Sequence, residues 1–352
     1  MTDAPTWSGI LATLLEGEDL SIFESTWAMD RVMQGEATPA QLAGFLVALR
    51  AKGVTVDEIV GFRDAILDHA VPLAVSSDAV DIVGTGGDGF RTVNVSTMSA
   101  IVAAAAGARV VKHGNKAASS ASGSSDVLSS LGVDLALPPE RVAQVLDEVG
   151  ITFVFASAFH PGFRHAGPVR ADLGIPTVFN FLGPLCNPAR PEANAVGVAR
   201  AEIIPLLVGV FQTRGASALV FRGDDGLDEL TTTGHSHVWE VSGGAVTEHD
   251  LDPRDLGIPR AAIGDLLGGS PDENAAIARA VLGGAGGAVR DIVLLNTAAA
   301  LAAWDLSHDP GCADRAILGR LRDRMEDAAR AIDSGDALAK LDAWVDATRA
   351  SR

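Results

Sequence analysis

The chain of 352 residues carries 27 Lys and Arg against 45 Asp and Glu, which gives a formal net charge of -18 at pH 7. Hydrophobic residues make up 47% and charged residues 20% of the composition, which excludes a disordered chain and leaves room for two folded domains. So negative a chain excludes nucleic acid and anionic membranes as general partners, because both select basic surfaces.

The N-terminal end predicts a protein without an export signal. Residues 1–5 are acidic and are not followed by an apolar core, unlike a signal peptide. No uninterrupted apolar run approaches the roughly 20 residues of a membrane helix. Cys186 and Cys312 lack the spacing of a zinc site, and each is expected to be a free thiol. We therefore expect a cytoplasmic protein.

The first part of the chain predicts a small domain made only of helices. Residues 21–24 and 38–41 both fit a capping box, the second with Pro39 at the first helical position. Thr55 begins a third helix that should run toward Pro72. No strand pattern precedes residue 79, so we expect a helical N-terminal domain over residues 1–75.

After residue 75 the pattern changes to short apolar runs, most of them separated by alanine-rich helical stretches. This alternation predicts a mostly parallel sheet with helices on both faces, hence an α/β domain over residues 76–352. Two later runs joined by a short glycine-containing turn predict a β-hairpin. The expected strands are 79–83, 108–111, 152–155, 195–199 and 218–221, and the expected hairpin pairs 237–241 with 245–249.

A glycine-rich turn follows the first expected strand. Gly84, Gly86 and Gly89 satisfy G-x-G-x-x-G, the fingerprint of dinucleotide-binding enzymes such as oxidoreductases. That fingerprint also needs an acid about 20 residues later to bind the ribose. Here the second strand is expected to end at Val111, and the next residue is Lys112. The glycines therefore fit better a turn whose backbone N–H groups close around a phosphate.

The window from residue 89 to residue 125 contains no Asp or Glu. Its four basic residues, Arg91, Arg109, Lys112 and Lys116, give it a charge of +4 in a chain of -18. Its second half combines lysines, glycines and many hydroxyls, a composition that suits a polyphosphate better than a single carboxylate. Residues 92–97 add hydroxyls at a helix N-terminus. The plain alternative is a solvated loop rich in Ser and Ala.

Four carboxylates occupy the six residues 224–229, after the last expected parallel strand. A surface turn is one interpretation. Beside a polyphosphate site, however, hard oxygen ligands are what Mg²⁺ requires. Asp228 and Glu229 are adjacent and would point in different directions in an extended backbone, so they could serve two different ions.

The segment around residues 160–170 contains candidates for binding an aromatic acid. A guanidinium near aromatic side chains, as at Arg170, suits a flat carboxylate held through two hydrogen bonds. His160 and His165 are candidate acid–base groups, although isolated histidines are more often structural.

Together these motifs resemble the anthranilate phosphoribosyltransferases, the tryptophan-pathway members of glycosyltransferase family 3. The resemblance covers nearly the whole chain and rests on residues 84–89, 94–97, 112–115, 122–123, 168–170, 180–188 and 226–229. It implies a helical domain that includes chain near residues 165–190, a larger α/β domain, a cleft between them and a homodimer. It implies transfer of the phosphoribosyl group from phosphoribosyl pyrophosphate to the amine of anthranilate, with two Mg²⁺ ions per monomer.

The resemblance also implies the residues that bind each group. No general acid or base is certain; Lys112 and the metal ions would stabilise the charge of the transition state. The residues implied for phosphoribosyl pyrophosphate are Gly84, Gly87, Asp88, Thr92, Asn94, Val95, Ser96, Thr97, Lys112, His113, Gly114, Asn115, Lys116, Ala117, Ala118, Ser119, Ser120 and Ser124. Those implied for anthranilate are Gly84, Asn115 and Arg170, and those for Mg²⁺ are Ser96, Asp228 and Glu229.

The chain departs from the family pattern at Ser157 and at Gly162–Phe163, which puts the shape of the aromatic site in doubt. Lys116 replaces a common arginine and keeps the charge. The pyrimidine nucleoside phosphorylases share the fold but would have a Lys-His-Ser-Thr-Gly-Gly segment, whereas Gly114 and Asn115 follow His113 here. A relative that only binds nucleic acid is disfavoured by the charge of -18 and by the intact acidic motif.

Overall fold

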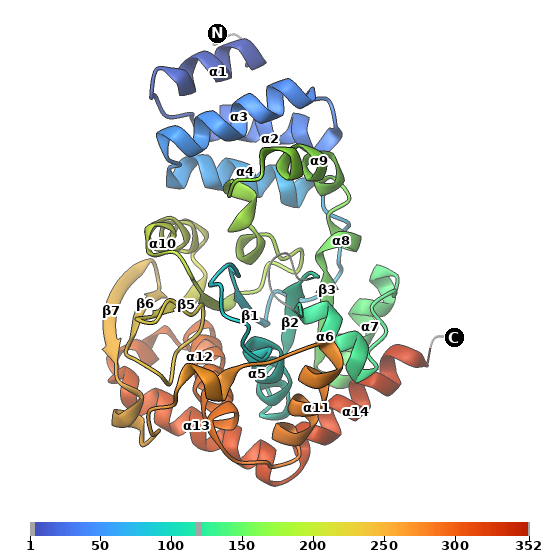
Figure 1. Ribbon diagram of the computed structural model, residues 1–352, viewed down its shortest axis with the longest axis vertical. Helices are drawn as coiled ribbons and strands as arrows, with labels where there is room; N and C mark the ends of the chain where they lie inside the picture. Colours follow the sequence, from blue (N-terminus) through green and yellow to red (C-terminus); the bar gives the residue numbers. More distant parts are fainter. Residues whose placement is uncertain (1–3, 117–121, 351–352) are drawn as a thin grey trace. The chain divides into compact units, whose positions relative to one another are not determined.

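The structure, a computed structural model, describes residues 4–116 and 122–350. Its chain divides into two compact units (Figure 1). The first unit comprises the chain up to Pro72 together with Ala156–Pro188, and the second comprises Leu73–Phe155 together with the chain from Ala189 to the C-terminus. A small helical region and a larger α/β region are thus present, which confirms the predicted fold class.

The first unit is helical throughout its described residues. The two predicted capping boxes are present at Ser21 and Thr38, and a third is present at Thr55, the predicted helix start; each hydroxyl accepts a backbone N–H three residues later. The core includes Phe45 and Phe62, whose rings meet edge to face at 5.7 Å. Its α-helices are α1 (Trp7–Leu15), α2 (Ile22–Gln34), α3 (Pro39–Lys52), α4 (Val56–Asp68), α8 (Ala156–Phe159) and α9 (Phe163–Leu173), followed by the short 3-10 turns η1 (Val178–Asn180) and η2 (Gly183–Leu185).

The second unit is built on one seven-stranded sheet in the order β3-β2-β1-β4-β5-β6-β7. The first five strands are parallel, and the last two form the predicted antiparallel hairpin. All five residues of β4 are buried, as expected of a strand covered on both faces. The strands are β1 (Val80–Gly84), β2 (Val110–Gly114), β3 (Ile151–Phe155), β4 (Ala193–Gly197), β5 (Ser217–Gly223), β6 (Ser236–Ser242) and β7 (Ala245–Leu251).

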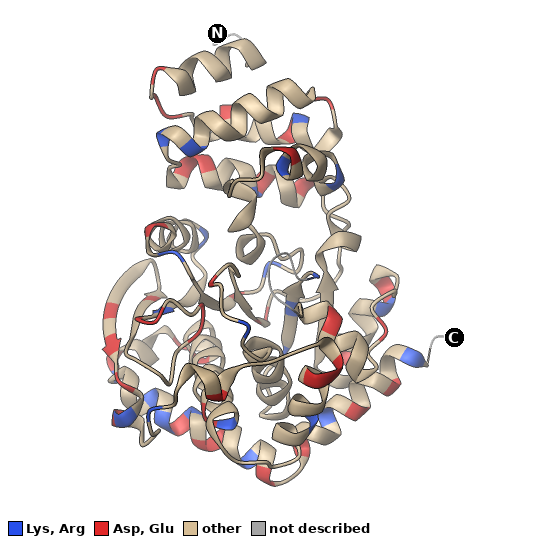
Figure 2. Ribbon diagram, viewed as in Figure 1, with Lys and Arg blue, Asp and Glu red and all other residues tan. Residues whose placement is uncertain are grey.

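Helices cover this sheet, and the long helix α12 (Ala288–His308) packs on β1, β4, β5 and α5. The outer helices α13 and α14 carry both acidic and basic side chains (Figure 2). The other helices of the unit are α5 (Val95–Ala105), α6 (Ser124–Leu131), α7 (Pro139–Val149), α10 (Ile204–Arg214), α11 (Pro271–Leu282), α13 (Ile317–Asp333) and α14 (Asp336–Arg349), with 3-10 turns η3 (Ala201–Ile203), η4 (Pro253–Leu256), η5 (Ile263–Leu266) and η6 (Pro310–Asp314).

Two predicted strand boundaries were wrong. Strand β2 continues past Val111 to Gly114, because it pairs with β3 at every residue and its Lys112 finds polar partners inside the unit. Strand β4 lies two residues earlier than expected, at Ala193–Gly197, in register with β1 and β5. The first correction moves Lys112, His113 and Gly114 of the predicted phosphate region from a loop to the end of a strand.

The strand order identifies where a ligand would bind. From β1 the chain proceeds to β2 and β3 on one side, and then returns to β4 on the other side of β1. In open parallel sheets the crevice for ligands lies at the carboxyl ends of the strands where the order reverses. Here that position is the paired ends of β1 and β4, at Gly84 and Gly197.

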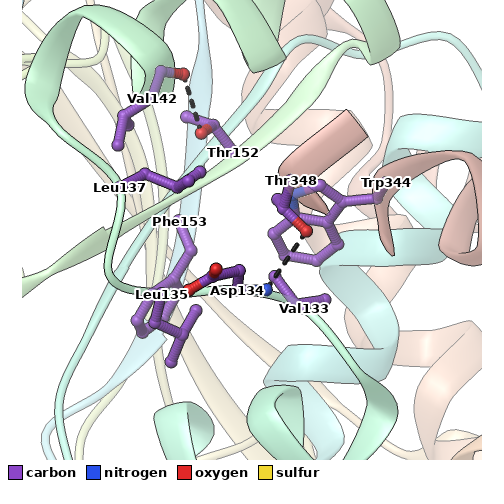
Figure 3. A pocket seen from close by; sticks show the side chains of 9 residues that line it. All are labelled: Val133, Asp134, Leu135, Leu137, Val142, Thr152, Phe153, Trp344 and Thr348. Atoms are coloured by element: carbon purple, nitrogen blue, oxygen red, sulfur yellow. Dashed lines mark hydrogen bonds between the residues drawn. The ribbon is translucent and has the colours of Figure 1, made fainter. Parts of the chain in front are cut away.

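A cavity elsewhere in this unit is too small to compete with that position. It lies between the segment 133–137 and helix α14, beside Trp344 and Thr348 (Figure 3). Its volume is about 10 Å³, room for one water at most. Within the described parts of the chain, no helix is both long and apolar enough to cross a membrane.

A buried ion pair fixes the hairpin to the helical layer. Arg320 of α13 donates to the Glu240 carboxylate of β6 at 2.6 Å, with exposed side-chain fractions of 3% and 2%. We expect Arg320→Ala to lower the free energy of unfolding by about 3 kcal/mol, because Glu240 is left buried without this partner. Arg254 also binds an acid but is 65% exposed, so Arg254→Ala should cost under about 1 kcal/mol. Urea denaturation checks both values, and equal losses would contradict the expectation.

Candidate active site

The site is organised around Asp228, which reaches the carboxyl ends of β1 and β4. A Cβ added at Gly84 would lie 2.1 Å from Asp228 Oδ2, and one added at Gly197 would lie 1.7 Å from the Asp228 backbone oxygen. Real Cβ atoms do not approach so closely, so any larger residue at either strand end would push Asp228 away. Glycine at both positions is therefore a requirement of the site.

The glycine-rich turn after β1 is held in place by hydrogen bonds at both ends. The N–H of Thr85 donates to Gly197 O at 2.9 Å, and the Thr85 hydroxyl accepts from Ala199 N at 3.1 Å. The N–H of Gly86 donates to Asp228 Oδ2 at 2.7 Å. Gly86 and Gly87 have φ values of 69° and 82°, which favour glycine. One N–H of the expected phosphate turn is thus already bound to a carboxylate of the same site.

Helix α5 begins at the end of this turn with residues predicted to bind phosphate. The Asn94 amide donates to Ser122 O at 3.0 Å and accepts from the Asn274 amide at 2.8 Å. It therefore links the turn after β1 to the loop after β2 rather than capping its own helix. Val95 and Thr97 are buried, and their N–H groups donate to Val93 O at 2.8 Å and to Asn94 O at 3.2 Å.

Lys112 lies inside the site rather than in a loop. Its side chain is 1% exposed, and its ammonium donates to Ile82 O at 2.6 Å and to Ser96 Oγ at 3.2 Å. Burial lowers the pKa of this ammonium, and the negative charges of Asp81, Glu229 and Asp228 oppose that shift. A fixed positive charge therefore lies beneath the turn and beside the first residues of α5.

Three carboxylates share the region of this ammonium. Burial, followed by the charge of Asp228, raises the pKa of Asp88 to about 7. Burial also raises the pKa of Asp228, although the Gly86 N–H and a hydrogen bond with Asp88 oppose the shift. Burial and the Asp228 charge raise the pKa of Glu229 well above its usual value, with Lys112 opposing. The carboxylates thus repel one another and exceed the single buried ammonium among them.

The other two acids of the 224–229 cluster, Asp224 and Asp225, have other partners. Asp225 accepts hydrogen bonds from Leu227 N and from the Thr231 hydroxyl, so it shapes the turn. Asp224 is exposed and pairs with His237 at 3.1 Å. Of the four clustered carboxylates, Asp228 contacts the turn after β1 and Glu229 contacts the start of α5.

The donor set fits a magnesium ion that shares its coordination with a ligand. Mg²⁺ prefers hard oxygen donors and binds proteins through one or two carboxylates plus substrate phosphates. Asp228 and Glu229 supply such donors, and a divalent cation would favour the ionised form of each carboxyl group, which burial alone disfavours by raising its pKa. Among the residues that the structure describes, no group of three His, Cys, Asp or Glu could hold a metal by itself. That result agrees with an ion completed by phosphate oxygens.

The loop after β2 borders the same site. A Cβ added at Gly114 would lie 2.5 Å from the Ser124 hydroxyl, which places Ser124 at the end of β2. The backbone oxygen of Asn115 accepts from Ser125 N at 3.4 Å, and its side chain accepts from Lys116 N at 2.8 Å. The predicted binding residues Ala117, Ala118, Ser119 and Ser120 lie outside the described residues.

Arg170, predicted to bind the aromatic acid, belongs to the first unit. Its guanidinium lies 5.3 Å from the centre of the Phe179 ring, and Phe163 meets Phe179 edge to face at 5.8 Å. Phe163, one of the departures from the family pattern, is therefore part of an aromatic cluster with Arg170. His160 stacks on Phe163 at 5.1 Å, and burial lowers its pKa to about 4. His160 is thus a buried ring packed within this aromatic cluster.

Three polar residues at the site escaped the sequence analysis. Asp81 is fully buried in β1 and accepts from His113 N at 3.1 Å. Asn274 holds Asn94, and Asn296 holds the backbone after Glu229. A polar residue within an apolar strand or helix, as at Asp81 and Asn296, is a signal that could have found two of them, because such a group needs a buried partner.

Known proteins resemble this chain along its whole length. The glycosyl transferase family matches in two parts, its helical bundle domain over residues 8–70 and its a/b domain over residues 76–338. The anthranilate phosphoribosyltransferase of Leifsonia xyli subsp. xyli is 68% identical over 99% of this chain and all of its own length, and that of Streptomyces griseus subsp. griseus is 56% identical over 99% and 96%.

Solved structures also resemble this chain over nearly its whole length. The anthranilate phosphoribosyltransferase of Thermus thermophilus superposes with a TM-score of 0.88 at 41% identity, covering 97% of this chain and 99% of its own. The Saccharomyces cerevisiae enzyme in complex with PRPP and Mg gives a TM-score of 0.87 at 28% identity and covers 98% of both chains. A complex of the yeast enzyme with 4-fluoroanthranilate gives 0.85 at 26% identity, covering 98% of this chain and 99% of its own.

The raised pKa of Asp88 predicts a pH dependence of stability in the ligand-free protein. Between about pH 4 and 7 the folded protein keeps a proton that the unfolded chain releases, so stability falls as the pH rises through this window. Asp88→Asn removes the titrating group, and we expect its urea midpoint to fall less than the wild-type midpoint over that range. Asp224→Asn, at the exposed acid of the cluster, should keep the wild-type slope. Identical slopes for all three proteins would contradict the assignment.

Proposed function

The chain belongs to the glycosyl transferase family with a helical bundle domain and an a/b domain, and we propose that its α/β unit binds phosphoribosyl pyrophosphate at the ends of β1 and β4. The chain transfers the 5-phosphoribosyl group from this donor to the amine of anthranilate, giving N-(5-phosphoribosyl)anthranilate and pyrophosphate in tryptophan biosynthesis. The gathering of Asp228 and Glu229 with Asp88 of the glycine-rich turn, at the ends of β1 and β4, is the observation that carries the proposed binding site.

The proposed donor site uses the turn after β1, the start of α5 and the loop after β2. Backbone groups around Gly87 would contact phosphate oxygens. Val95 and Thr97, whose N–H groups donate to Val93 O and Asn94 O, would support this contact from the first turn of α5. The exposed Lys116 ammonium is free to reach a phosphate directly. Lys112 would act at longer range, because its ammonium is bound to Ile82 O and Ser96 Oγ.

The reaction uses Mg²⁺, which relatives of known structure hold together with PRPP. When bound, the ion supplies positive charge that stabilises the pyrophosphate leaving group. We propose that Ser96, Asp228 and Glu229 hold it, with two ions per monomer. Asp228 and Glu229 interact with different neighbours, Gly86 and Ser96 respectively, which supports separate roles for the two acids.

The chain's own residues position the donor and stabilise charge instead of moving a proton with a strong base. The anthranilate amine is weakly basic, and its proton becomes acidic only as the new bond to the ribose forms. Displacement at the anomeric carbon places positive charge on the sugar and negative charge on the leaving group. The fixed Lys112 ammonium would stabilise the leaving group, and the buried carboxylates would face the positive charge of the sugar.

We propose that Gly84, Asn115 and Arg170 bind anthranilate, with Arg170 pairing with its carboxylate. Support comes from the aromatic cluster of Phe163 and Phe179 around the Arg170 guanidinium, a setting that suits a flat aromatic acid. We also propose two functional domains. One comprises residues 1–75 with chain near residues 165–190, and the other comprises residues 76–352. A cytoplasmic location is proposed as well.

A homodimer is proposed through the helical unit. Five large apolar side chains among its described residues are exposed: Leu15 at 78%, Phe23 at 63%, Val47 and Ile175 at 43% each, and Ile22 at 42%. Apolar side chains exposed on one small unit are typical of a surface that a second subunit covers. Light scattering of the purified protein measures its mass directly, and a monomer would contradict the proposal.

The proposed function predicts the substrates that the purified protein consumes. Anthranilate fluorescence should decline only when phosphoribosyl pyrophosphate and Mg²⁺ are both present, because the leaving group needs the charge of the ion. Omitting either component is the control, and thymidine with inorganic phosphate tests the nucleoside phosphorylase alternative. No decline with all components present would refute the assignment, and cleavage of thymidine would favour the alternative.

The two substrates are predicted to respond differently to loss of Arg170. We expect Arg170→Ala to raise the KM for anthranilate by roughly tenfold or more, since a charge-assisted hydrogen bond is removed, and to leave the KM for the donor nearly unchanged. Arg164→Ala, at an exposed arginine of the same helix, is the matched control. Equal rises in both constants for Arg170→Ala would remove this residue from the aromatic site.

A further inference from the structure

One buried asparagine grips the backbone directly after the acid pair. Asn296 of α12 is fully buried, and its Oδ1 accepts from Leu230 N at 2.9 Å. Its Nδ2 donates to Leu230 O and to Ile292 O, each at 2.9 Å. A single side-chain amide therefore satisfies both backbone groups of Leu230, the residue that follows Glu229.

The bonds from Asn296 take the place of the backbone hydrogen bonds that a helix or strand would supply to Leu230. Residues 227–235 belong to neither a helix nor a strand, yet Leu230 is 1% exposed and its polar backbone groups need buried partners. On the other side, Asp228 packs against Gly84 and Gly197. The backbone of residues 228–230 is thus held between two strand ends and one helix.

The bonds from Asn296 limit movement of the acidic segment. Asp228 and Glu229 belong to residues 227–235, which form neither helix nor strand, so this segment has no ladder of backbone hydrogen bonds of its own to keep the two carboxyl groups together. Packing against glycines cannot resist such movement by itself, because it only permits close approach. Directional hydrogen bonds to the neighbouring backbone can resist it.

We propose that Asn296 is a positioning residue, which fixes the Leu230 backbone so that Asp228 and Glu229 stay close enough to bind a divalent cation together with a diphosphate. This inference rests on the proposed metal role of the two acids. Asparagine suits the task because its amide offers a donor and an acceptor side by side. Aspartate would lack the donor, and leucine would lack both groups.

The adjacent residue provides a matched control. Thr297 is also fully buried on α12, but its hydroxyl donates to Val293 O within its own helix. Thr297→Val therefore removes a buried polar group from the same helix without a contact to residues 228–230. Asn296→Leu removes both bonds to Leu230, and Asn296→Asp removes the donor alone.

The test measures binding of Mn²⁺, by the loss of its free EPR signal, to the full-length protein in the presence of inorganic pyrophosphate. We expect Asn296→Leu to weaken Mn²⁺ binding by about tenfold or more, as loss of an outer-shell partner does, and Thr297→Val to stay within about twofold of wild type. The KM for phosphoribosyl pyrophosphate should rise with it, while the KM for anthranilate stays unchanged. A folded Asn296→Leu protein with wild-type Mn²⁺ binding would overturn the proposal.

Two further measurements keep the outcomes distinct. If Asn296→Leu does not fold, Asn296→Asp takes its place in the Mn²⁺ experiment. Hydrogen exchange of the wild-type protein tests the proposal in either case. The Leu230 amide should be as protected from exchange as the amides of α12, and fast exchange at Leu230 would overturn the proposal. Asp228→Asn separates the inference from its premise. If Asp228→Asn binds Mn²⁺ as wild type does, the metal role fails; if it loses binding while Asn296→Leu does not, only the positioning role fails.

Discussion

The approach of Asp228 to the ends of β1 and β4 is the constraint on which the site depends. Its carboxylate takes the N–H of Gly86, and its backbone lies where a side chain at Gly197 would be. The turn after β1 and the acidic segment after β5 are therefore fixed relative to each other by direct contact. The strand order of the sheet reverses at this point, which creates the crevice. Gly84 and Gly197 have no side chains, and this leaves the space that Asp228 occupies.

The site combines opposite charges that come from different parts of the chain. The window 89–125 contributes no acid and supplies the lysines, while Asp228 and Glu229 arrive from the segment after β5 and Asp88 stands just before the window. Lys112 alone cannot balance three carboxylates. The remaining negative charge is what a divalent ion neutralises, and that ion in turn presents positive charge to a polyphosphate. Net charge describes the outer surface of this protein, whereas the site depends on local charge.

The sequence was sufficient for the parts of the structure that follow local rules. Capping boxes located the helices near Ser21 and Thr38, and alternating apolar runs located the strands to within a few residues. The placement of Lys112 was missed because a charged residue ordinarily ends a buried strand, and only the fold reveals the carbonyl and hydroxyl that receive its ammonium. Asn274 and Asn296 were missed for a related reason: their partners lie 180 and 66 residues away.

The burial of Lys112 has a practical consequence for labelling this protein. The chain has four lysines, and the side chains of Lys52 and Lys112 are 6% and 1% exposed. Lys340 is half-buried, with its ammonium bound to Val149 O, which leaves Lys116 as the exposed lysine among the four. An amine-selective reagent would therefore attach most readily beside the diphosphate loop. A single fluorophore placed in this way would report on that loop without any engineered cysteine.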